Sequence, residues 1–320
     1  MRVVVTGAAG FIGANLVRRL LGDSRITSVV AVDDLSTGHA DNLAGLDGLE
    51  SASVSVLDRP AVLDAVSGAD AVVHLAARPS VPRSIEDPMA THEANVTGTL
   101  NVLEAARRSA PHCHVVLASS SSVYGDNPTL PKHEELLPGP VSPYAASKLA
   151  GEAYARSYAR CFSVPVLPFR FFNVFGPYQR AGHAYAAVVP AFLERALAGE
   201  PVTIHGDGRQ SRDFTFVDSV TAVLREAVVR RVASEDPVNL AFGGRHTLLE
   251  VVRMLEEVLE RPVEATHTPE RPGDVRHSQA ATDRLRALFP SLTPVPVQEG
   301  IRATVEWWRS APLARADLAR

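Results

Sequence analysis

Lysine is almost absent from this chain, which has 2 lysines against 30 arginines in 320 residues. Cysteine is just as scarce, because Cys113 and Cys161 are the only two. They make neither a disulfide framework nor a metal-ligand cluster, so we expect no metal and two buried, reduced thiols. No apolar run approaches membrane-spanning length, and a strand that begins at residue 2 leaves no room for a signal peptide. These absences favour a cytoplasmic protein.

A basic tract is also missing. The net charge is −4 at pH 7, and residues of both signs are spread along the chain. We therefore expect neither nucleic acid nor a membrane surface as a partner. The hydrophobic share of 46% and the charged share of 21% are ordinary for a globular enzyme of one large or two modest domains.

One of the two lysines, Lys148, follows Tyr144 by four residues. In a helix this spacing puts both side chains on one face. A tyrosine has a free pKa of about 10, so it acts as a base near neutrality only beside a fixed positive charge, which the ammonium would supply. A solvated lysine beside a buried tyrosine is the structural alternative, and the spacing alone does not exclude it.

Glycines near the N-terminus occupy the turn between an expected strand and an expected helix. Residues 2–5 form a β-branched run, and residues 12–21 have apolar side chains at helical spacing. Between them lie Gly7, Gly10 and Gly13, which would let backbone N–H groups approach a pyrophosphate at the helix N-terminus. A glycine-rich turn in some other α/β protein is the alternative.

A carboxylate follows the second expected strand, residues 28–32. Asp33 lies 20 positions after Gly13, close to the spacing of an acid that binds the adenosine ribose 2′-hydroxyl. A carboxylate at this place repels a 2′-phosphate, and no arginine directly follows it. The pattern therefore favours NAD over NADP.

Expected strands alternate with expected helices through the first half of the chain. This predicts an α/β fold with a doubly wound parallel sheet and helices on both faces. Residues that follow strands would lie at the carboxyl edge of the sheet, where ligands bind. The expected strands are 3–5, 29–32, 53–56, 71–75, 115–118 and 164–170, and the helices 59–67, 92–109 and 144–161.

Beyond residue 176 the alternation loosens. Segments rich in proline, glycine and arginine surround helices expected at 188–198, 219–230 and 248–259. We expect a nucleotide-binding domain at 1–175 and a smaller, mixed α/β lobe for the substrate at 176–320. The two would be interleaved, because 210–245 partly returns to the first domain, chiefly through 236–242.

Together these features resemble the extended short-chain dehydrogenase/reductase superfamily, in particular its NAD-dependent nucleotide-sugar epimerases and dehydratases. The resemblance runs from Met1 to about residue 309, and its specificity lies in the combination of motifs. They are Gly7-x-x-Gly10-x-x-Gly13, Asp33-Asp34-Leu-Ser-Thr-Gly38, His74-Leu-Ala-Ala77, Asn95-x-x-Gly98-Thr, Ser119-Ser-Ser-Ser-Val-Tyr-Gly125, Tyr144-x-x-x-Lys148, Phe171-Phe-Asn173-Val-Phe-Gly-Pro177, Arg212-Asp213 and Arg271-Pro-Gly-Asp274.

The resemblance implies a Rossmann domain that binds NAD. Leu57 and Asp58 would flank the adenine, although an aspartate after a strand is often only a helix cap. The cofactor contacts that it implies are Gly7, Gly10, Phe11, Ile12, Gly13, Asp33, Asp34, Ser36, Thr37, Gly38, Leu57, Asp58, Leu75, Ala76, Ala77, Asn95, Ser119, Tyr144 and Lys148.

The resemblance also implies three catalytic residues. Tyr144 would take the proton from a sugar hydroxyl, and Ser120 would hydrogen-bond that hydroxyl. Lys148 would lower the pKa of the phenol and bind the nicotinamide ribose, and the oxidised nicotinamide would shift the phenol in the same direction. For Ser120 the alternative is a serine run that merely ends a strand.

A UDP-sugar is the implied substrate. Arg212 and Arg271 resemble ligands of its diphosphate, because a guanidinium suits phosphate oxygens; in a chain so rich in arginine, solvated surface arginines are the alternative. Asn173 resembles another diphosphate contact, and Asp274 the residue that binds the nucleotide ribose. The implied substrate contacts are Arg83, Ser120, Ser121, Asn173, Arg180, Val188, Arg212, Arg271, Asp274 and Ser278.

The residues after Ser120 indicate the reaction. All the enzymes that this chain resembles begin by moving a hydride from sugar C4 to NAD. The 4,6-dehydratases then use an Asp-Glu pair where this chain has Ser121 and Ser122, and UDP-glucuronate decarboxylases use a glutamate in place of Ser122. What remains is return of the hydride to the opposite face, which is C4 epimerisation with no net redox change.

The identity of the sugar depends on two positions. Ser278 stands where a tyrosine restricts some UDP-galactose 4-epimerases to small hexoses, so a larger sugar would fit. Arg180 stands where UDP-uronate epimerases carry an arginine, and it would pair with a C6 carboxylate, unless it is a surface loop residue. The space at Ser278 would admit a C6 carboxylate or an N-acetyl group, and Arg180 favours UDP-glucuronate and UDP-galacturonate. The loop 80–84, with Arg83, resembles instead that of UDP-N-acetylhexosamine epimerases, and UDP-glucose stays open as well.

An NAD-sensing regulator without turnover is the alternative of another class. Such proteins typically lack the tyrosine or the lysine, and this chain has both. The resemblance further suggests a homodimer through helices 92–109 and 144–161. Their small residues, Ala145, Ala146, Ala150 and Gly151, allow close packing.

Overall fold

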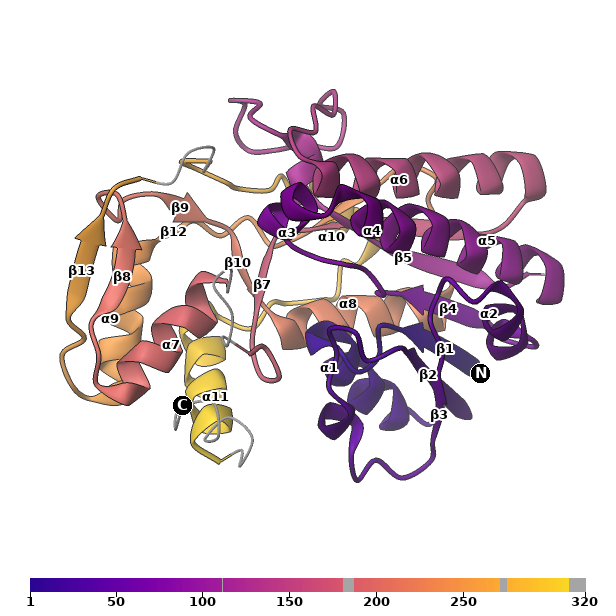
Figure 1. Cartoon of the computed structure of the whole chain (residues 1–320), viewed down its shortest axis with the longest axis horizontal. Helices are drawn as coiled ribbons and strands as arrows, with labels where there is room; N and C mark the ends of the chain where they lie inside the picture. The colour runs from indigo at the N-terminus through magenta and orange to yellow at the C-terminus, as the bar shows by residue number, and fades with distance from the viewer. Residues whose placement is uncertain (111, 181–186, 271–274, 311–320) are drawn as a thin grey trace.

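A parallel sheet of seven strands forms the centre of the protein (Figure 1). In this computed structural model, the described residues are 1–110, 112–180, 187–270 and 275–310. The strand order is β11-β6-β5-β4-β1-β2-β3, with β1 (Arg2–Thr6), β2 (Ser28–Asp33), β3 (Leu49–Ser53), β4 (Ala71–His74), β5 (His114–Ser120), β6 (Val166–Phe171) and β11 (Val238–Leu240). The order reverses at β1 and β4, and ligands bind at such a reversal. The predicted doubly wound fold is confirmed.

Two hydrophobic layers cover the sheet because successive strand residues face opposite sides. Val3 and Val5 of β1 pack with helices α1 (Phe11–Leu21), α8 (Val217–Arg230) and α10 (Asp283–Leu288). Val4 packs on the other side with α2 (Arg59–Val66), α5 (Gly98–Ser109) and α6 (Pro143–Phe162). Figure 1 shows α5 and α6 on one side of the sheet and α1 and α8 on the other.

A smaller group of elements lies beside the carboxyl edge of the sheet, away from the N-terminus (Figure 1). Its helices α7 (Val188–Ala198), α9 (Leu248–Leu259) and α11 (Val297–Ser310) share a separate hydrophobic core. Three two-stranded sheets complete it: β7 (Asn173–Phe175) with β10 (Phe214–Phe216), β8 (Val202–His205) with β13 (Ala265–Thr268), and β9 (Ser211–Arg212) with β12 (His246–Thr247). The strand β11, within the expected returning stretch 236–242, pairs with β6 in the main sheet. The domain boundary at residue 175 stays a prediction.

The prediction of a strand at residues 53–56 is wrong. The true strand, β3, runs from Leu49 to Ser53 and pairs Leu49 with Val29 of β2. As an exposed edge strand it uses polar residues, and Glu50 forms an ion pair of 3.0 Å with Arg2. Val56 lies beyond the strand, and its carbonyl accepts a hydrogen bond of 3.0 Å from Asn101. The alternating valines of 53–56 therefore mark a loop that packs on α5.

The helix expected at 92–109 begins earlier than predicted. Helix α4 (Pro88–His92) starts after Asp87, whose carboxylate accepts the Ala90 N–H at 3.0 Å, and a proline suits the first helical position. A π-helical turn, η2 (Glu93–Thr97), joins α4 to α5. The thiols also differ from expectation: Cys113 is buried, but Cys161 is exposed, because it lies on the outer face near the end of α6.

Within the described part of the chain, no helix is both long and apolar enough to cross a membrane. The same residues contain no group of three or more histidine, cysteine or acidic side chains placed to hold a metal ion.

Candidate active site

The glycine turn after β1 brings three backbone segments into close contact. Gly7 has a φ of 68°, and a Cβ atom there would lie 2.6 Å from the backbone nitrogen of Ala76. A Cβ atom on Gly13 would lie 2.1 Å from the carbonyl oxygen of Gly7. Helix α1 starts after Gly10, and among the described residues no side chain caps its first N–H groups. The backbone N–H groups of this first turn, which contains Phe11 and Ile12, are suited to bind a phosphate.

Asp33, at the end of β2, lies against this turn. Its carboxylate accepts the N–H groups of Ala9 and Leu35, each at 2.8 Å. Burial raises the pKa of Asp33, and these two hydrogen bonds oppose the change. A Cβ atom on Gly38 would lie 3.0 Å from the same carboxylate. Asp33 therefore shapes the glycine turn as well as ending β2 at the expected ribose position.

Other predicted cofactor residues lie around these two. Asp34 accepts the Ser36 N–H at 3.0 Å, and Thr37 follows in the same exposed turn. Leu57 is 42% exposed, and Asp58 caps α2 by accepting the Ala61 N–H at 3.1 Å. In this structure Asp58 is therefore the N-cap of α2, as the alternative to an adenine contact predicted.

A buried polar chain leads from β1 to α6. His74 contacts the hydroxyls of Thr6 at 2.7 Å and Thr99 at 3.0 Å. The Thr99 hydroxyl donates to the Asn95 carbonyl oxygen at 2.7 Å, and the Asn95 amide donates to Ser147 of α6 at 2.9 Å. Burial, helped by the charge of Lys148, lowers the pKa of His74 to about 3, so the ring is neutral.

Asn95 also fixes the loop that follows β4. Its side-chain oxygen accepts the Arg78 N–H at 2.7 Å. This loop contains Leu75, Ala76 and Ala77, and the Ala76 N–H donates to Thr6 at 3.2 Å. Asn95 thus fixes the loop at the edge of the expected cofactor site. It does so from the π-helical turn η2, which the helix propensities of its residues did not predict.

The three predicted catalytic residues come together at the end of β5. Ser142 caps α6 by accepting the Ala145 N–H at 3.2 Å, so Tyr144 and Lys148 occupy the first turns of that helix. The Lys148 ammonium donates to the Ala118 carbonyl oxygen at 3.0 Å and lies 6.0 Å from the centroid of the Tyr144 ring. Ser120 lies near enough to Tyr144 to lower the pKa of its phenol, and its hydroxyl oxygen accepts a hydrogen bond of 2.9 Å from the Ser122 hydroxyl.

The electrostatics of this trio differ from expectation. Burial raises the pKa of Tyr144, and the hydrogen bond with Ser120 opposes the change. Burial also lowers the pKa of Lys148, to about 8. The expectation that Lys148 makes the phenol acidic is therefore not met by the groups of the chain alone, because both side chains have lost solvent.

Glu152 and Arg170 were missed by the sequence reasoning. Glu152 lies one turn beyond Lys148 and accepts the Ser119 hydroxyl at 2.5 Å. Arg170 of β6 binds the same carboxylate through Nε at 2.9 Å and Nη2 at 2.8 Å. The sequence did contain one indication of Glu152. It follows Lys148 by four residues, as Lys148 follows Tyr144, so all three side chains lie on one face of the helix.

Several predicted substrate residues lie close together at the start of β7 and the end of β9. The Asn173 N–H donates to the Asp213 carbonyl oxygen at 3.3 Å, next to Arg212, and the Ser278 N–H donates to the Ser211 carbonyl oxygen at 3.0 Å. Asp213 is fully buried and accepts the N–H groups of Gly243 and Ala280 at 3.0 and 3.1 Å. Burial raises its pKa to about 6.

Within the described ranges, no hydrogen bond joins the remaining substrate residues to this group. Arg83 lies in α3 (Val81–Glu86), Ser121 opens the 3₁₀ turn η3 (Ser121–Tyr124), and Val188 begins α7. Arg180 lies two residues after Tyr178, whose backbone is left-handed with a φ of 68°. Arg271 and Asp274 lie outside the described residues.

Comparison with known proteins identifies the family of this chain. The model of the NAD dependent epimerase/dehydratase family matches residues 3–241. A UDP-glucose 4-epimerase of Mycolicibacterium smegmatis is 38% identical over 97% of this chain and 99% of its own length. A probable UDP-glucuronate 4-epimerase of Rhizobium meliloti is 35% identical over 96% of this chain and 97% of its own length.

Solved structures give the same result. The UDP-N-acetylglucosamine 4-epimerase from Methanobrevibacter ruminantium has a TM-score of 0.91 and 34% identity, over 97% of this chain and 98% of its own. The UDP-glucose 4-epimerase of Thermus thermophilus, solved with NAD, has a TM-score of 0.87 and 36% identity, over 97% of this chain and 100% of its own. The chain therefore belongs to the NAD-dependent epimerase/dehydratase family, within the extended short-chain dehydrogenase/reductases.

Proposed function

We propose that this protein is an NAD-dependent UDP-sugar 4-epimerase, an isomerase that inverts C4 of a UDP-hexose through a transient 4-keto sugar. The observation that carries the proposal is the meeting of Ser120, Tyr144 and Lys148 at the carboxyl edge of the sheet. The turn η3 that follows Ser120 supplies serines and no carboxylate, so it offers no acid or base for elimination at C5 and C6.

The glycine turn fits NAD. A side chain at Gly7 or Gly13 would collide with backbone atoms, so both positions keep the backbone close to the N-terminus of α1, and Asp33 ends the neighbouring strand. We assign the pyrophosphate to the N–H groups of this turn and the adenosine ribose to Asp33. When bound, NAD would accept a hydride from C4 and return it to the opposite face of the same carbon.

The residues of the chain would move and hold the proton. The Tyr144 hydroxyl oxygen would take the proton of the C4 hydroxyl and give it back when C4 is reduced again. Ser120 would hold the C4 oxygen, and the Lys148 ammonium would stabilise the phenolate against the burial that raises its pKa. Because the same proton and hydride return to the sugar, no other reactant is consumed.

Isotope retention tests this function. Purified protein would be incubated separately with UDP-glucuronate, UDP-N-acetylglucosamine and UDP-glucose, each deuterated at C4. Epimerisation predicts a C4-inverted sugar that keeps its deuterium at C4 by NMR. A stable 4-keto-6-deoxy product or release of carbon dioxide would refute the proposal. Tight NAD binding without any turnover would favour the sensing regulator.

Within this reaction we favour UDP-glucuronate and UDP-galacturonate as the substrate pair. Arg180 is partly buried in the loop after β7, and a guanidinium there suits a C6 carboxylate. Ser278 lies beside the Ser211–Arg212 strand and leaves room for a substituted sugar. UDP-N-acetylglucosamine is the second candidate, since the Ser80 cap holds the backbone of Arg83 in a loop that resembles those of N-acetylhexosamine epimerases.

We also propose a homodimer through the outer faces of α5 and α6. The exposed positions of α6 include the small or uncharged residues Ala146, Ala153, Tyr154, Ser157 and Cys161. Small and uncharged side chains on this face of α6 allow the close approach that a symmetric helix pairing needs. Light scattering on the wild type and an Ala153→Arg variant tests it, with a dimer expected for the first and a monomer for the second.

A further inference from the structure

Three consecutive residues at the end of β5 face three residues of α6 spaced four apart. Ser120 lies near enough to Tyr144 to lower the pKa of its phenol. The Ala118 carbonyl oxygen accepts from Lys148 at 3.0 Å, and the Ser119 hydroxyl donates to Glu152 at 2.5 Å. Residues four apart on a helix share one face, so hydrogen bonds fix this face of α6 to the strand at two successive levels, next to the level of Tyr144 and Ser120.

The third level, formed by Ser119 and Glu152, contains none of the three predicted catalytic residues, yet it is the most polar and among the most buried. Glu152 is 6% exposed, Ser119 3% and Arg170 2%. Arg170 binds both oxygens of Glu152, at 2.9 and 2.8 Å, in a bidentate pair. The Ser119 hydroxyl and Arg170 Nε share the oxygen Oε1, so removing the serine hydroxyl leaves both arginine bonds in place.

Stability is a poor explanation for this buried ion pair. Moving two charges out of water is costly, and their attraction inside the protein often only offsets that cost. Arg170 is also incompletely satisfied, since its Nη1 atom has no hydrogen-bond acceptor among the described residues. A packed apolar pair would serve stability as well, but it would not fix the direction and distance between α6 and β5.

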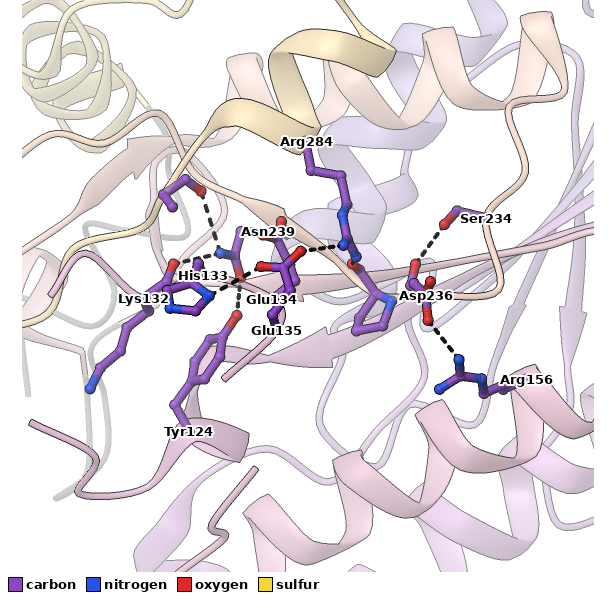
Figure 2. A network of polar contacts seen from close by, with 12 residues as sticks. Tyr124, Lys132, His133, Glu134, Glu135, Arg156, Ser234, Asp236, Asn239 and Arg284 are labelled. Carbon is purple, nitrogen blue, oxygen red and sulfur yellow. Dashed lines mark hydrogen bonds and ion pairs between the residues drawn. The ribbon is translucent and has the colours of Figure 1, made fainter. Parts of the chain in front are cut away.

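The pair is itself held from the far side. The Arg170 guanidinium lies 4.6 Å from the centroid of the buried Tyr124 ring. Figure 2 shows the next link, in which the Tyr124 hydroxyl donates to Asn239 of β11 at 2.6 Å. Asn239 in turn donates to the Lys132 carbonyl oxygen at 2.8 Å, and its N–H binds Glu134 at 2.9 Å. Glu152 is thus connected through β6 to the strand and loop beyond it.

We propose that Glu152, held by Arg170, is a positioning residue that sets the register of α6 on β5 and thereby the distance between Tyr144 and Ser120. This inference rests on the proposed function of Tyr144 as the base. A displacement of about 1 Å between reacting groups costs up to about 100-fold in rate. The contact of Ser119 with Glu152 therefore contributes to turnover although neither side chain meets the sugar.

The Ser119→Ala variant tests the proposal with the smallest change. Its matched control is Tyr158→Phe, which removes a hydrogen bond of 2.8 Å to Glu104 from the other end of the same helix. We expect Ser119→Ala, assayed at saturating NAD, to lower kcat about 10- to 100-fold with KM for the UDP-sugar within about twofold. Tyr158→Phe should lose comparable thermal stability and keep kcat within about twofold. Equal kcat in the two variants, or a loss of NAD affinity that accounts for the effect, would overturn the proposal.

A Glu152→Asp variant separates position from charge. It keeps the ion pair with Arg170 and withdraws the carboxylate by one methylene, so kcat should fall as in Ser119→Ala. Unchanged kcat in a folded Glu152→Asp protein would contradict a positioning role.

A titration without turnover separates this inference from the proposed function. Ultraviolet difference titration against Tyr144→Phe measures the pKa of Tyr144, which should rise in Ser119→Ala as the bond with Ser120 loosens. If the wild type has no epimerase activity, the proposed function is wrong, but the pKa of Tyr144 can still be compared between the wild type and Ser119→Ala. If that pKa does not shift, the positioning role of Glu152 is wrong and the proposed function is unaffected.

Discussion

The Nζ atom of Lys148 lies 6.0 Å from the centroid of the Tyr144 ring. The ammonium is held by the Ala118 carbonyl at the end of β5, at 3.0 Å, rather than by the phenol. Burial lowers the pKa of Lys148 to about 8 and raises that of Tyr144. Keeping Lys148 charged in the folded protein therefore lowers the free energy of unfolding. A mutation that removes the charge should affect activity and stability in opposite directions.

Replacing Lys148 by methionine should abolish activity and increase stability. The folded pKa of about 8 lies below the ordinary 10.5, so at pH 7 the folded protein retains this proton at a cost of up to about 3 kcal/mol. The lost bond to Ala118 reduces the gain to about 1–2 kcal/mol. Above pH 8 the folded wild type releases the proton, so the gain should shrink between pH 8 and 10.5. Urea unfolding across this range measures it, and a gain that grows with pH would contradict the account.

Tyr144→Phe should lower kcat for UDP-sugar interconversion by about 100- to 10,000-fold, because a positioned general acid and base contributes that much. Its KM and NAD affinity should change little, since only the hydroxyl is removed. The control is Tyr158→Phe in the same helix, whose hydroxyl binds Glu104. Interconversion at the wild-type rate in Tyr144→Phe would remove the basis of the mechanism.

Gly13→Ala should weaken NAD binding about tenfold or more and reduce stability by about 1–3 kcal/mol. The added methyl group would lie 2.1 Å from the Gly7 carbonyl oxygen and 2.7 Å from the Ala8 Cα atom, so α1 must move away from the turn. Gly139→Ala is the matched control, because among the described residues no atom beyond its own chain neighbours lies within 4 Å of the added Cβ atom. Calorimetry with NAD measures both variants, and equal affinities would show that α1 need not approach the turn.

Much of the fold could be predicted because its signals are local. The buried valines of β1, the glycine turn and the alternation of elements each follow from short stretches of sequence, and the family comparison confirms the nucleotide-binding fold. The edge strand β3 escaped prediction because its polar residues are stabilised by neighbours such as Arg2, which no local pattern reveals. The π-helical turn around Asn95 escaped for a related reason, since hydrogen bonds to Arg78 and Ser147 fix it from outside.

The candidate site divides in the same way. Tyr144, Lys148 and Ser120 follow from motif spacing, and the structure brings them to one strand end. The pKa of Tyr144 could not be predicted, because its direction depends on how much solvent folding removes. The partnership of Glu152 with Arg170 joins residues 18 positions apart on different elements, so only the packed structure reveals it.

Arg180→Ala should discriminate among the candidate sugars. If the guanidinium pairs with a C6 carboxylate, its removal should reduce kcat/KM for UDP-glucuronate by about 10- to 100-fold, the effect of losing a charge-assisted hydrogen bond. UDP-glucose has no such carboxylate, so its kcat/KM should change less than about threefold. Arg302→Ala, an exposed arginine of α11, is the control for the change in net charge. Coupled assays with both substrates measure the ratio. Equal losses for the two sugars would remove the preference for a uronate, whereas a selective loss would place the specificity of the enzyme in the loop after β7.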